Sequence, residues 1–518
     1  MALLKKNPTK LKSWSLLIEK YQIEKEQKIL DFLSEPNRLE DFTITWNDFY
    51  VDFSKNRLSK KTFELLIELS NESGLKNNIE EYFKGSKINE TESRAVLHTA
   101  LRSAQNSDKE INKIVSNSLG RINIISDEIN SGKRLGFTGK KITDVVNIGI
   151  GGSHLGPEMA TNALAYYSKG IKPHFISNID PDYTEKLLES INPETTIFII
   201  VSKTFTTIET LENAKKVRSW FIENAREEYI KDHFIAVSNN LTDPKLFGIK
   251  EDNILSIPEW VGGRFSLWGS VGLVVAIVIG SKHFSEFLKG AEEMDQHFRN
   301  TDFEKNIPVT LGLISLWYNN FFNCETEAVI PYNQFLDKLP DYLQQASMES
   351  NGKGVDRNGE KVNYQTGSII WGSTGTNAQH AFFQLLHQGT KLIPTDFLAF
   401  KESLYGDEKQ HQILTSNFLA QTNALLEGNK INKTEIHRTI EGNKPSNTIV
   451  INRLTPSSLG SLIAMYESKI FVIGSILNIY SFDQWGVELG KSIAKQILKG
   501  GKSDLDISSS KTLSKLEK

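Results

Sequence analysis

The feature that most limits how this chain can fold is a series of short runs that are apolar at successive positions. The run at 196–201 (TIFIIV) is the clearest, and similar runs lie at 144–149, 174–178 and 233–237. Helix-like stretches such as 209–224 separate them. Strands that are apolar on both faces and alternate with amphipathic helices indicate a parallel sheet that helices cover on both sides.

The same pattern divides the chain into regions. Residues 1–119 contain helix-like stretches and few strand-like runs, so we expect an all-helical arm. Residues 120–280 form the first expected α/β domain. A second follows at 281–500, where short apolar runs recur and helix-like stretches surround them. Residues 501–518 are rich in Ser, Lys and Asp and are expected to form a flexible tail. The strand-like runs of the second domain lie at 327–331, 369–371 and 392–394.

Charge and composition exclude several classes of protein. The 60 Lys and Arg residues are balanced by 63 Asp and Glu residues, which argues against a nucleic-acid surface. The longest apolar run, 271–280, is far shorter than the roughly 20 residues of a membrane helix. The N-terminus lacks the apolar core of a signal peptide. A single cysteine, Cys324, allows no intrachain disulfide and is expected to be a small core residue. We therefore expect a cytoplasmic protein without nucleic-acid or membrane partners.

A glycine-rich turn follows the first apolar run. Gly149, Gly151 and Gly152 precede Ser153 and His154. Glycines at the carboxyl end of a strand let the backbone approach an anion, and the next helix directs free N–H groups toward it. His154 replaces the third glycine of a dinucleotide-binding fingerprint. The turn suits one phosphate or a sugar hydroxyl, and a purely structural turn is equally compatible.

A loop rich in hydroxyl groups follows the run at 196–201. Ser202, Thr204, Thr206 and Thr207 surround one cation, Lys203. A phosphate dianion needs many convergent donors but not many charges. Capping of the following helix would account for one or two of these hydroxyls but not for four. The loop therefore favours phosphate binding.

Two further segments carry residues suited to acid–base chemistry. Arg264 lies in VGGRFSLW between a Gly-Gly turn and bulky aromatic residues, where it could stabilise an oxyanion or form a buried ion pair. Glu349 lies in SMESNGK after an apolar methionine, and it is either a partly desolvated base or a surface residue at the end of a helix.

Three other titratable residues are less distinctive. His380 lies in an aromatic-rich helix start, where a core histidine is the more common outcome. Glu488 and Lys491 stand one helical turn apart, as in a simple surface ion pair. Because no cluster has metal-ligand spacing, we expect no catalytic metal.

Taken in order, six segments resemble the signature blocks of the glucose-6-phosphate isomerase family over roughly residues 40–500. The resemblance implies two sugar-isomerase-type (SIS), doubly wound α/β domains, the larger one packed against the N-terminal arm. It also implies a homodimer with active sites at the subunit interface, and no cofactor. The segments are GIGGSHLGP, SKTFTTIET, VGGRFSLW, MESNGK, GTNAQHAFFQLLHQGTK and SFDQWGVELGK.

The resemblance also implies roles for individual residues. Glu349 would move a proton between C2 and C1 through a cis-enediol, and Arg264 would stabilise the enediolate. His380, from the neighbouring subunit, and Lys491 would act during ring opening. His387 is an alternative histidine, but its place in the motif is not the catalytic one. The residues implied to bind the substrate are Gly152, Ser153, Ser202, Lys203, Thr204, Thr207, Gln345 and Glu209, the last as a partner of the histidine.

The sequence differs from the family pattern in two places, and two alternative functions remain compatible with it. The loops at 400–455 are expected to be trimmed, and Ser373, Thr374 and Ala378 replace other residues near His380. These differences affect loop shape rather than the assigned positions. A non-catalytic sugar-phosphate sensor could retain the 202–207 loop and dispense with the catalytic residues. An isomerase for another phosphosugar, such as mannose 6-phosphate, would retain both.

Overall fold

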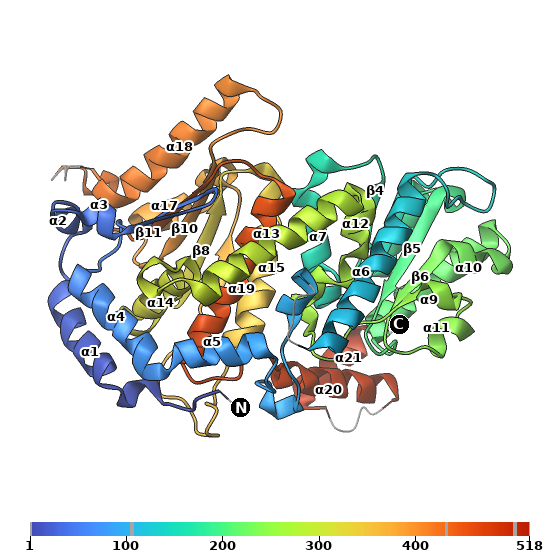
Figure 1. Cartoon of the computed structure of the whole chain (residues 1–518), viewed down its shortest axis with the longest axis horizontal. Coiled ribbons are helices and arrows are strands. Elements are labelled where there is room, and N and C mark those ends of the chain that lie inside the picture. Colours follow the sequence, from blue (N-terminus) through green and yellow to red (C-terminus); the bar gives the residue numbers. More distant parts are fainter. Residues whose placement is uncertain (1–2, 104–107, 430–433, 501–504, 517–518) are drawn as a thin grey trace. The chain divides into compact units, whose positions relative to one another are not determined.

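The computed structural model describes residues 3–103, 108–429, 434–500 and 505–516. Its contacts divide the chain into two units, one ending at Ser481 and the other beginning at Phe482. Both sheets and most helices belong to the first unit (Figure 1). The second unit contains α20 (Glu488–Leu498) and α21 (Ile507–Leu516), neither of which has a buried residue. The predicted flexible tail therefore contains a helix.

The first sheet is parallel throughout and has the strand order β4-β3-β5-β6-β7. The chain runs from β3 outward to β4 and then to the other side of β3, so its direction of winding changes between β3 and β5. Ligands bind in open α/β sheets at such points, beyond the carboxyl ends of the strands. The strands are β3 (Asp144–Ile148), β4 (Lys172–Ile176), β5 (Thr196–Val201), β6 (Phe234–Val237) and β7 (Ile254–Leu255).

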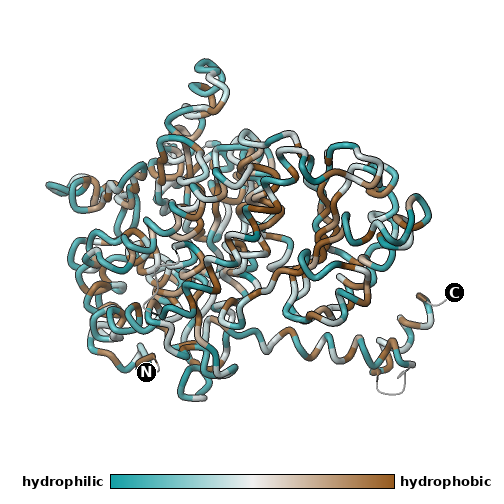
Figure 2. The backbone as a smooth tube through the Cα atoms, turned by 45° about the vertical axis from the view of Figure 1, so that its right-hand side comes forward, coloured by the Kyte–Doolittle hydropathy of each residue, from teal (hydrophilic) through white to brown (hydrophobic). Residues whose placement is uncertain are grey.

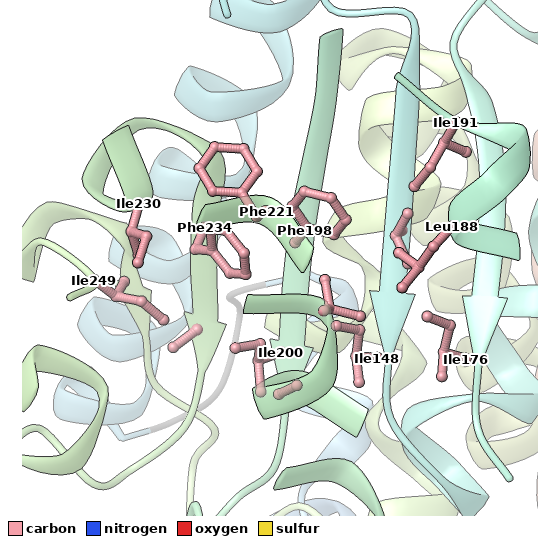
Figure 3. Close-up of a cluster of buried hydrophobic side chains, with 14 of the residues drawn as sticks. Ile148, Ile176, Leu188, Ile191, Phe198, Ile200, Phe221, Ile230, Phe234 and Ile249 are labelled. Atoms are coloured by element: carbon pink, nitrogen blue, oxygen red, sulfur yellow. The ribbon is translucent and has the colours of Figure 1, made fainter. Parts of the chain in front are cut away.

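Buried aromatic rings hold one face of this sheet against its helices. Phe198 of β5 stacks on Phe234 of β6 with a centroid distance of 4.8 Å, and Phe221 of α9 meets Phe234 edge-on at 5.3 Å (Figure 3). Helix α12 also contacts β4, and it packs against α6 and α7. The helices of this region are α6 (Lys109–Asn130), α7 (Leu155–Ala163), α8 (Pro181–Ser190), α9 (Ile208–Asn224), α10 (Ile230–His233), α11 (Asp243–Leu246) and α12 (Leu273–Ile279).

The second sheet has six strands in the order β1-β2-β11-β10-β8-β9. Strands β8 to β11 are parallel, and β2 runs antiparallel to β11. The strands are β1 (Thr43–Trp46), β2 (Phe49–Asp52), β8 (Thr326–Pro331), β9 (Ile369–Gly372), β10 (Thr395–Phe400) and β11 (Ser446–Ile451).

Helices cover both faces of the second sheet. On one face, Lys469 of α19 and Ser315 of α14 bond to Glu327 of β8. On the other, Phe383 of α17 and Phe418 of α18 pack against the strands. The helices are α13 (Ser281–Asn300), α14 (Ile307–Asn320), α15 (Leu339–Gln344), α16 (Gly375–Gln379), α17 (Phe383–Gln388), α18 (Glu408–Glu427) and α19 (Pro456–Ile476).

Helix α19 lies in the interior of the first unit, beside α13 and α14. Within the described ranges it is the one helix with the length and composition of a membrane span, and its apolar window is wholly buried inside the protein. Figure 2 shows the hydrophobic stretches of the chain gathered inside the first unit, with hydrophilic turns around them.

The N-terminal arm was predicted to be all-helical, but it contains the hairpin β1–β2. The reason lies in an alternation of period two: Ile44, Phe49 and Val51 are buried, whereas Thr45 and Tyr50 between them are exposed. Asn47, with φ of 46°, allows the two-residue reversal between the strands. The arm's helices are α1 (Lys12–Glu24), α2 (Ile29–Leu33), α3 (Arg38–Asp41), α4 (Lys60–Ser73) and α5 (Leu75–Lys84).

Other details also differ from expectation. The predicted strand at 392–394 is a connection, and β10 begins just after it at Thr395. The sequence pattern also predicted no strand at the residues that form β11.

The expected domain boundaries meet the structure differently. The boundary after residue 119 falls inside α6, so this helix joins the two regions, whereas the boundary at 280 falls between α12 and α13. A division into small and large domains at these exact residues stays a prediction.

Candidate active site

The glycine-rich turn follows β3 as the 3₁₀ helix η4 (Gly151–Ser153). Gly151 adopts a φ of +62°, which favours glycine. A Cβ atom on Gly152 would lie 2.1 Å from the carbonyl oxygen of Gly263, so only glycine permits this approach. The side chain of Asn147 donates to the Ser153 carbonyl at 2.9 Å and ties the turn to β3. The turn is therefore packed directly against the segment that carries Arg264.

The hydroxyl-rich loop joins β5 to α9. Ser202 Oγ donates to Thr207 Oγ1 at 3.1 Å, and the hydroxyls of Thr204 and Thr206 lie 2.6 Å apart. Thr207 is the N-cap residue of α9, but its side chain makes no capping hydrogen bond. The first N–H groups of this 17-residue helix therefore point toward the loop without a side-chain acceptor from Thr207. The loop and the helix end together can bind an anion.

Phe205 has an unusual backbone conformation within this loop. Its φ is +55°, in the left-handed region that a bulky residue rarely adopts. The ring is buried and meets Phe247 edge-on at 6.2 Å. Packing of the ring thus compensates for the backbone strain and fixes the course of the loop around the hydroxyl groups.

Lys203 does not point toward the hydroxyl groups of its own loop. Its Nζ lies 3.2 Å from the carbonyl oxygen of Glu259, 3.4 Å from a carboxylate oxygen of Glu259 and 3.4 Å from the carbonyl oxygen of Val261. Burial lowers the pKa of Lys203, and the nearby Glu259 carboxylate opposes part of that shift. The lysine therefore ties the loop after β5 to the segment that leads into Gly263 and Arg264.

Arg264 lies in the 3₁₀ helix η9 (Gly263–Trp268), and its side chain is almost wholly buried. Its Nε donates to Ser350 Oγ at 2.7 Å, and Nη2 donates to the Ser481 carbonyl at 2.6 Å. Nη1 lies 3.3 Å from Oε2 of Glu349. Three separate acceptors thus hold the guanidinium plane in one orientation.

Glu349 ends the π-helical segment η13 (Gln345–Glu349), which continues α15. Its side chain is 20% exposed, so it is accessible from the site. Gln345 Nε2 donates to the same oxygen, Oε2, at 3.3 Å. A Cβ atom on Gly151 would lie 3.1 Å from Gln345 Nε2, so Gln345 reaches the glycine turn. Single-turn π segments are frequent at functional sites.

These contacts join four sequence segments into one site. The loop after β5 reaches the Arg264 segment through Lys203, the Arg264 segment meets the glycine turn at Gly152, and Arg264 and Gln345 both contact Glu349. A cradle for an anion therefore connects directly to a carboxylate held beside a buried arginine. This arrangement can bind a phosphate at one end and transfer a proton at the other.

Two predicted residues lie outside these contacts, and a third belongs to the second unit. His380 follows α16 and is exposed to solvent. Glu209, in the first turn of α9, makes no hydrogen bond or ion pair with its side chain among the described residues. Lys491 belongs to the second unit, where its Nζ bonds to Glu488 at 2.8 Å. Their assignments stay predictions.

Sequence reasoning missed several residues that support the site. Ser350 and the Ser481 carbonyl accept hydrogen bonds from Arg264, and Glu259 contacts Lys203. Ser350 and Ser481 each lie within a recognised block, so their place in the motif was an available signal. Glu259 carried no such signal. Within the described ranges, no group of three or more His, Cys, Asp or Glu side chains is arranged to hold a metal ion.

The chain is similar to known proteins over nearly its whole length. A model of the family described as phosphoglucose isomerase matches residues 52–515. A glucose-6-phosphate isomerase from Christiangramia forsetii is 53% identical over 95% of both chains. One from Wigglesworthia glossinidia brevipalpis is 48% identical over 95% of this chain and 94% of that relative.

A solved structure agrees with these matches. The crystal structure of a glucose-6-phosphate isomerase from Chlamydia trachomatis superposes with a TM-score of 0.88 at 31% identity and covers 99% of both chains. A hypothetical protein from Thermus thermophilus shares the fold, with a TM-score of 0.64 at 23% identity. With a family match over most of its length and relatives of this identity, the chain belongs to the phosphoglucose isomerase family.

Proposed function

We propose that this protein catalyses the reversible isomerisation of glucose 6-phosphate and fructose 6-phosphate, an aldose–ketose isomerisation of glycolysis and gluconeogenesis, in the cytoplasm. The observation that carries the proposal is the contact between Arg264 and Glu349 at one end of a site whose other end is the loop 202–207. Family membership agrees with this chemistry.

The proposed reaction uses the site from end to end. The substrate phosphate occupies the cradle of Ser153, Ser202, Thr204 and Thr207, together with the start of α9. Binding of this remote group supplies energy that aligns the reacting carbons. The role of Lys203 is to hold the cradle against the Arg264 segment and to add positive charge to the site.

Glu349 is the proposed base. It removes the proton from C2 of the open-chain aldose and returns it to C1, through a cis-enediol intermediate. Arg264 stabilises the negative charge that develops on the substrate oxygen, because a fixed and buried guanidinium needs no reorganisation during the step. Gln345 orients the Glu349 carboxylate and the sugar. Proton transfer between adjacent carbons requires no redox cofactor.

We infer that ring opening uses His380 and Lys491, with Glu209 as a partner of the histidine. His380 is exposed and lies apart from the Glu349 contacts, as a residue that serves a second subunit would. Leu385 of the following helix is 43% exposed on the same segment. The active form is therefore proposed to be a homodimer in which each subunit supplies His380 to its partner.

The test is a coupled assay with fructose 6-phosphate, run beside mannose 6-phosphate at equal concentrations. We expect turnover of fructose 6-phosphate to glucose 6-phosphate and a much lower rate with the mannose compound. If the protein turns over mannose 6-phosphate but not fructose 6-phosphate, the proposed substrate is wrong. Tight phosphosugar binding without turnover would favour a sensor.

A further inference from the structure

A buried carboxylate outside the site connects the element that carries Arg264 with the helix that leads into the Glu349 segment. Glu467 lies within α19 and is 2% exposed. Its Oε1 accepts a hydrogen bond from Tyr342 Oη at 2.8 Å and from Trp268 Nε1 at 3.1 Å. Its Oε2 is bonded to Arg102.

Two of the bonded residues lie near the proposed catalytic groups along the chain, one after Arg264 and the other before Glu349. Trp268 ends η9, the 3₁₀ helix that contains Arg264. Tyr342 lies in α15, which continues directly into the π segment that ends at Glu349. One carboxylate on a third element therefore bonds to both elements at the same time.

Aromatic packing reinforces the connection to η9. The ring of His98 stacks on Phe265 with a centroid distance of 4.4 Å and an interplanar angle of 14°. The guanidinium carbon of Arg102 lies 4.3 Å from the ring centroid of Trp268. Both residues belong to η3 (His98–Arg102), so η3 covers the buried side of η9 with two planar contacts. Phe265 directly follows Arg264.

Burying the charged groups of this cluster costs free energy, and stabilising the fold alone does not require them. Arg102 also bonds to Asp295 of α13, so two buried carboxylates share one guanidinium. Burial raises the pKa of both carboxyl groups. Apolar residues of similar size often serve a core equally well, whereas hydrogen bonds to a carboxylate fix direction as well as distance.

We propose that Glu467 is a positioning residue for the isomerisation, which holds η9 and α15 at the separation that brings Arg264 and Glu349 into contact. The inference rests on the proposed function and adds a set of residues to it: Glu467, with Tyr342 and Trp268 as its bonded contacts to the two elements. None of the three contacts the reacting atoms.

Tyr342→Phe is the principal test because it deletes one hydroxyl from the Glu467 cluster and retains the ring. Its matched control is Tyr466→Phe. Tyr466 is also buried and donates to a buried carboxylate, Asp396 of β10, at 3.1 Å, and it adjoins Glu467 on α19. Both variants lose one tyrosine–carboxylate hydrogen bond, but only Tyr342 belongs to a helix that continues into the segment of the proposed base.

The two variants are expected to have similarly reduced melting temperatures. Tyr342→Phe should lower kcat for fructose 6-phosphate about tenfold, because small misplacements of catalytic groups are costly. Inhibition by inorganic phosphate, which probes the cradle alone, should be unchanged. Tyr466→Phe should retain the kcat of the wild type. Equal kcat values for the two variants would overturn the inference.

A double variant separates positioning from general weakening of the fold. If Tyr342 acts through Glu349, adding Tyr342→Phe to Glu349→Gln should not lower the residual rate further. A multiplicative loss would show that Tyr342 does not act through Glu349 and would contradict the proposal. Absence of any wild-type turnover would instead count against the proposed function, so the two failures are distinguishable.

Discussion

Arg264 Nη1 lies 3.3 Å from Glu349 Oε2, although 85 positions separate the two residues in the chain. The arginine is buried and held by Ser350 and Ser481, and the carboxylate is partly open to the site. The pair therefore combines a fixed positive charge with a base that a substrate can reach. The first prediction concerns this base.

Glu349→Gln should retain substrate binding and lose turnover. The amide keeps the shape of the side chain but cannot accept a proton, so kcat should fall by about 10²–10⁴. Exchange of the C2 proton with solvent, followed by NMR, should slow in step with turnover. Glu360→Gln, on a loop outside the site, is the control. Near-normal turnover of Glu349→Gln would remove Glu349 from the mechanism.

Lys203→Ala should weaken phosphosugar binding. Loss of a charged hydrogen-bond donor costs about 1.5–3 kcal/mol, or roughly a 10- to 150-fold loss of affinity. Because Lys203 contacts Glu259, the variant Glu259→Gln distinguishes anchoring from charge. If the two variants lose affinity equally, Lys203 acts by anchoring the segment before Arg264. Unchanged affinity of Lys203→Ala for phosphosugar and phosphate would show that the lysine serves neither role.

Mixed dimers should test the exchange of His380 between subunits. His380→Ala and Glu349→Gln homodimers should each be nearly inactive. When they are dissociated and reassociated together, about half of the dimers should be mixed, each with one intact site, so activity should recover to about a quarter of the wild type. Verified mixed dimers without recovered activity would place both residues in the site of one subunit.

Prolonged dialysis against a chelator should leave isomerase activity intact, because the proposed chemistry uses a carboxylate and an arginine. Elemental analysis before and after dialysis is the accompanying measurement. Stoichiometric zinc or iron whose removal abolishes activity would contradict the mechanism. A requirement for a nicotinamide would contradict it equally.

His297 should make the stability of the protein depend on pH. Burial lowers its pKa to about 4 from an ordinary value of 6.5, and its Nε2 accepts a hydrogen bond from the Ile307 N–H at 3.1 Å. The unfolded chain therefore binds the proton more readily than the folded one. Stability from the neutral ring is fully present above pH 6.5 and is lost as pH falls toward 4.

Between pH 7.5 and 5 this loss should amount to about 2 kcal/mol in the free energy of unfolding by denaturant. His297→Gln retains an acceptor for Ile307 but cannot titrate, so it should lose correspondingly less stability over that range. His437→Gln, at an exposed position, is the control and should retain the wild-type dependence. Identical slopes for wild type and His297→Gln would contradict the prediction.

The sequence by itself determined the features that depend on local pattern. The apolar run 196–201 predicted β5, the alternation with helices predicted parallel sheets, and the motif blocks predicted the family. Arg264 and Glu349 were identified as candidates from their immediate neighbours alone. Each of these inferences uses residues close together in the chain, where periodicity and steric preference act directly.

The tertiary structure decided which distant groups meet. It paired the hairpin β1–β2 with β11, directed Lys203 toward Glu259 rather than toward its own loop, and brought Tyr342 and Trp268 together on Glu467. A sequence pattern indicates which face of an element is buried, but not which distant side chain packs against it. Such contacts depend on the packing of several elements at once, and the contact between Arg264 and Glu349 is one of them.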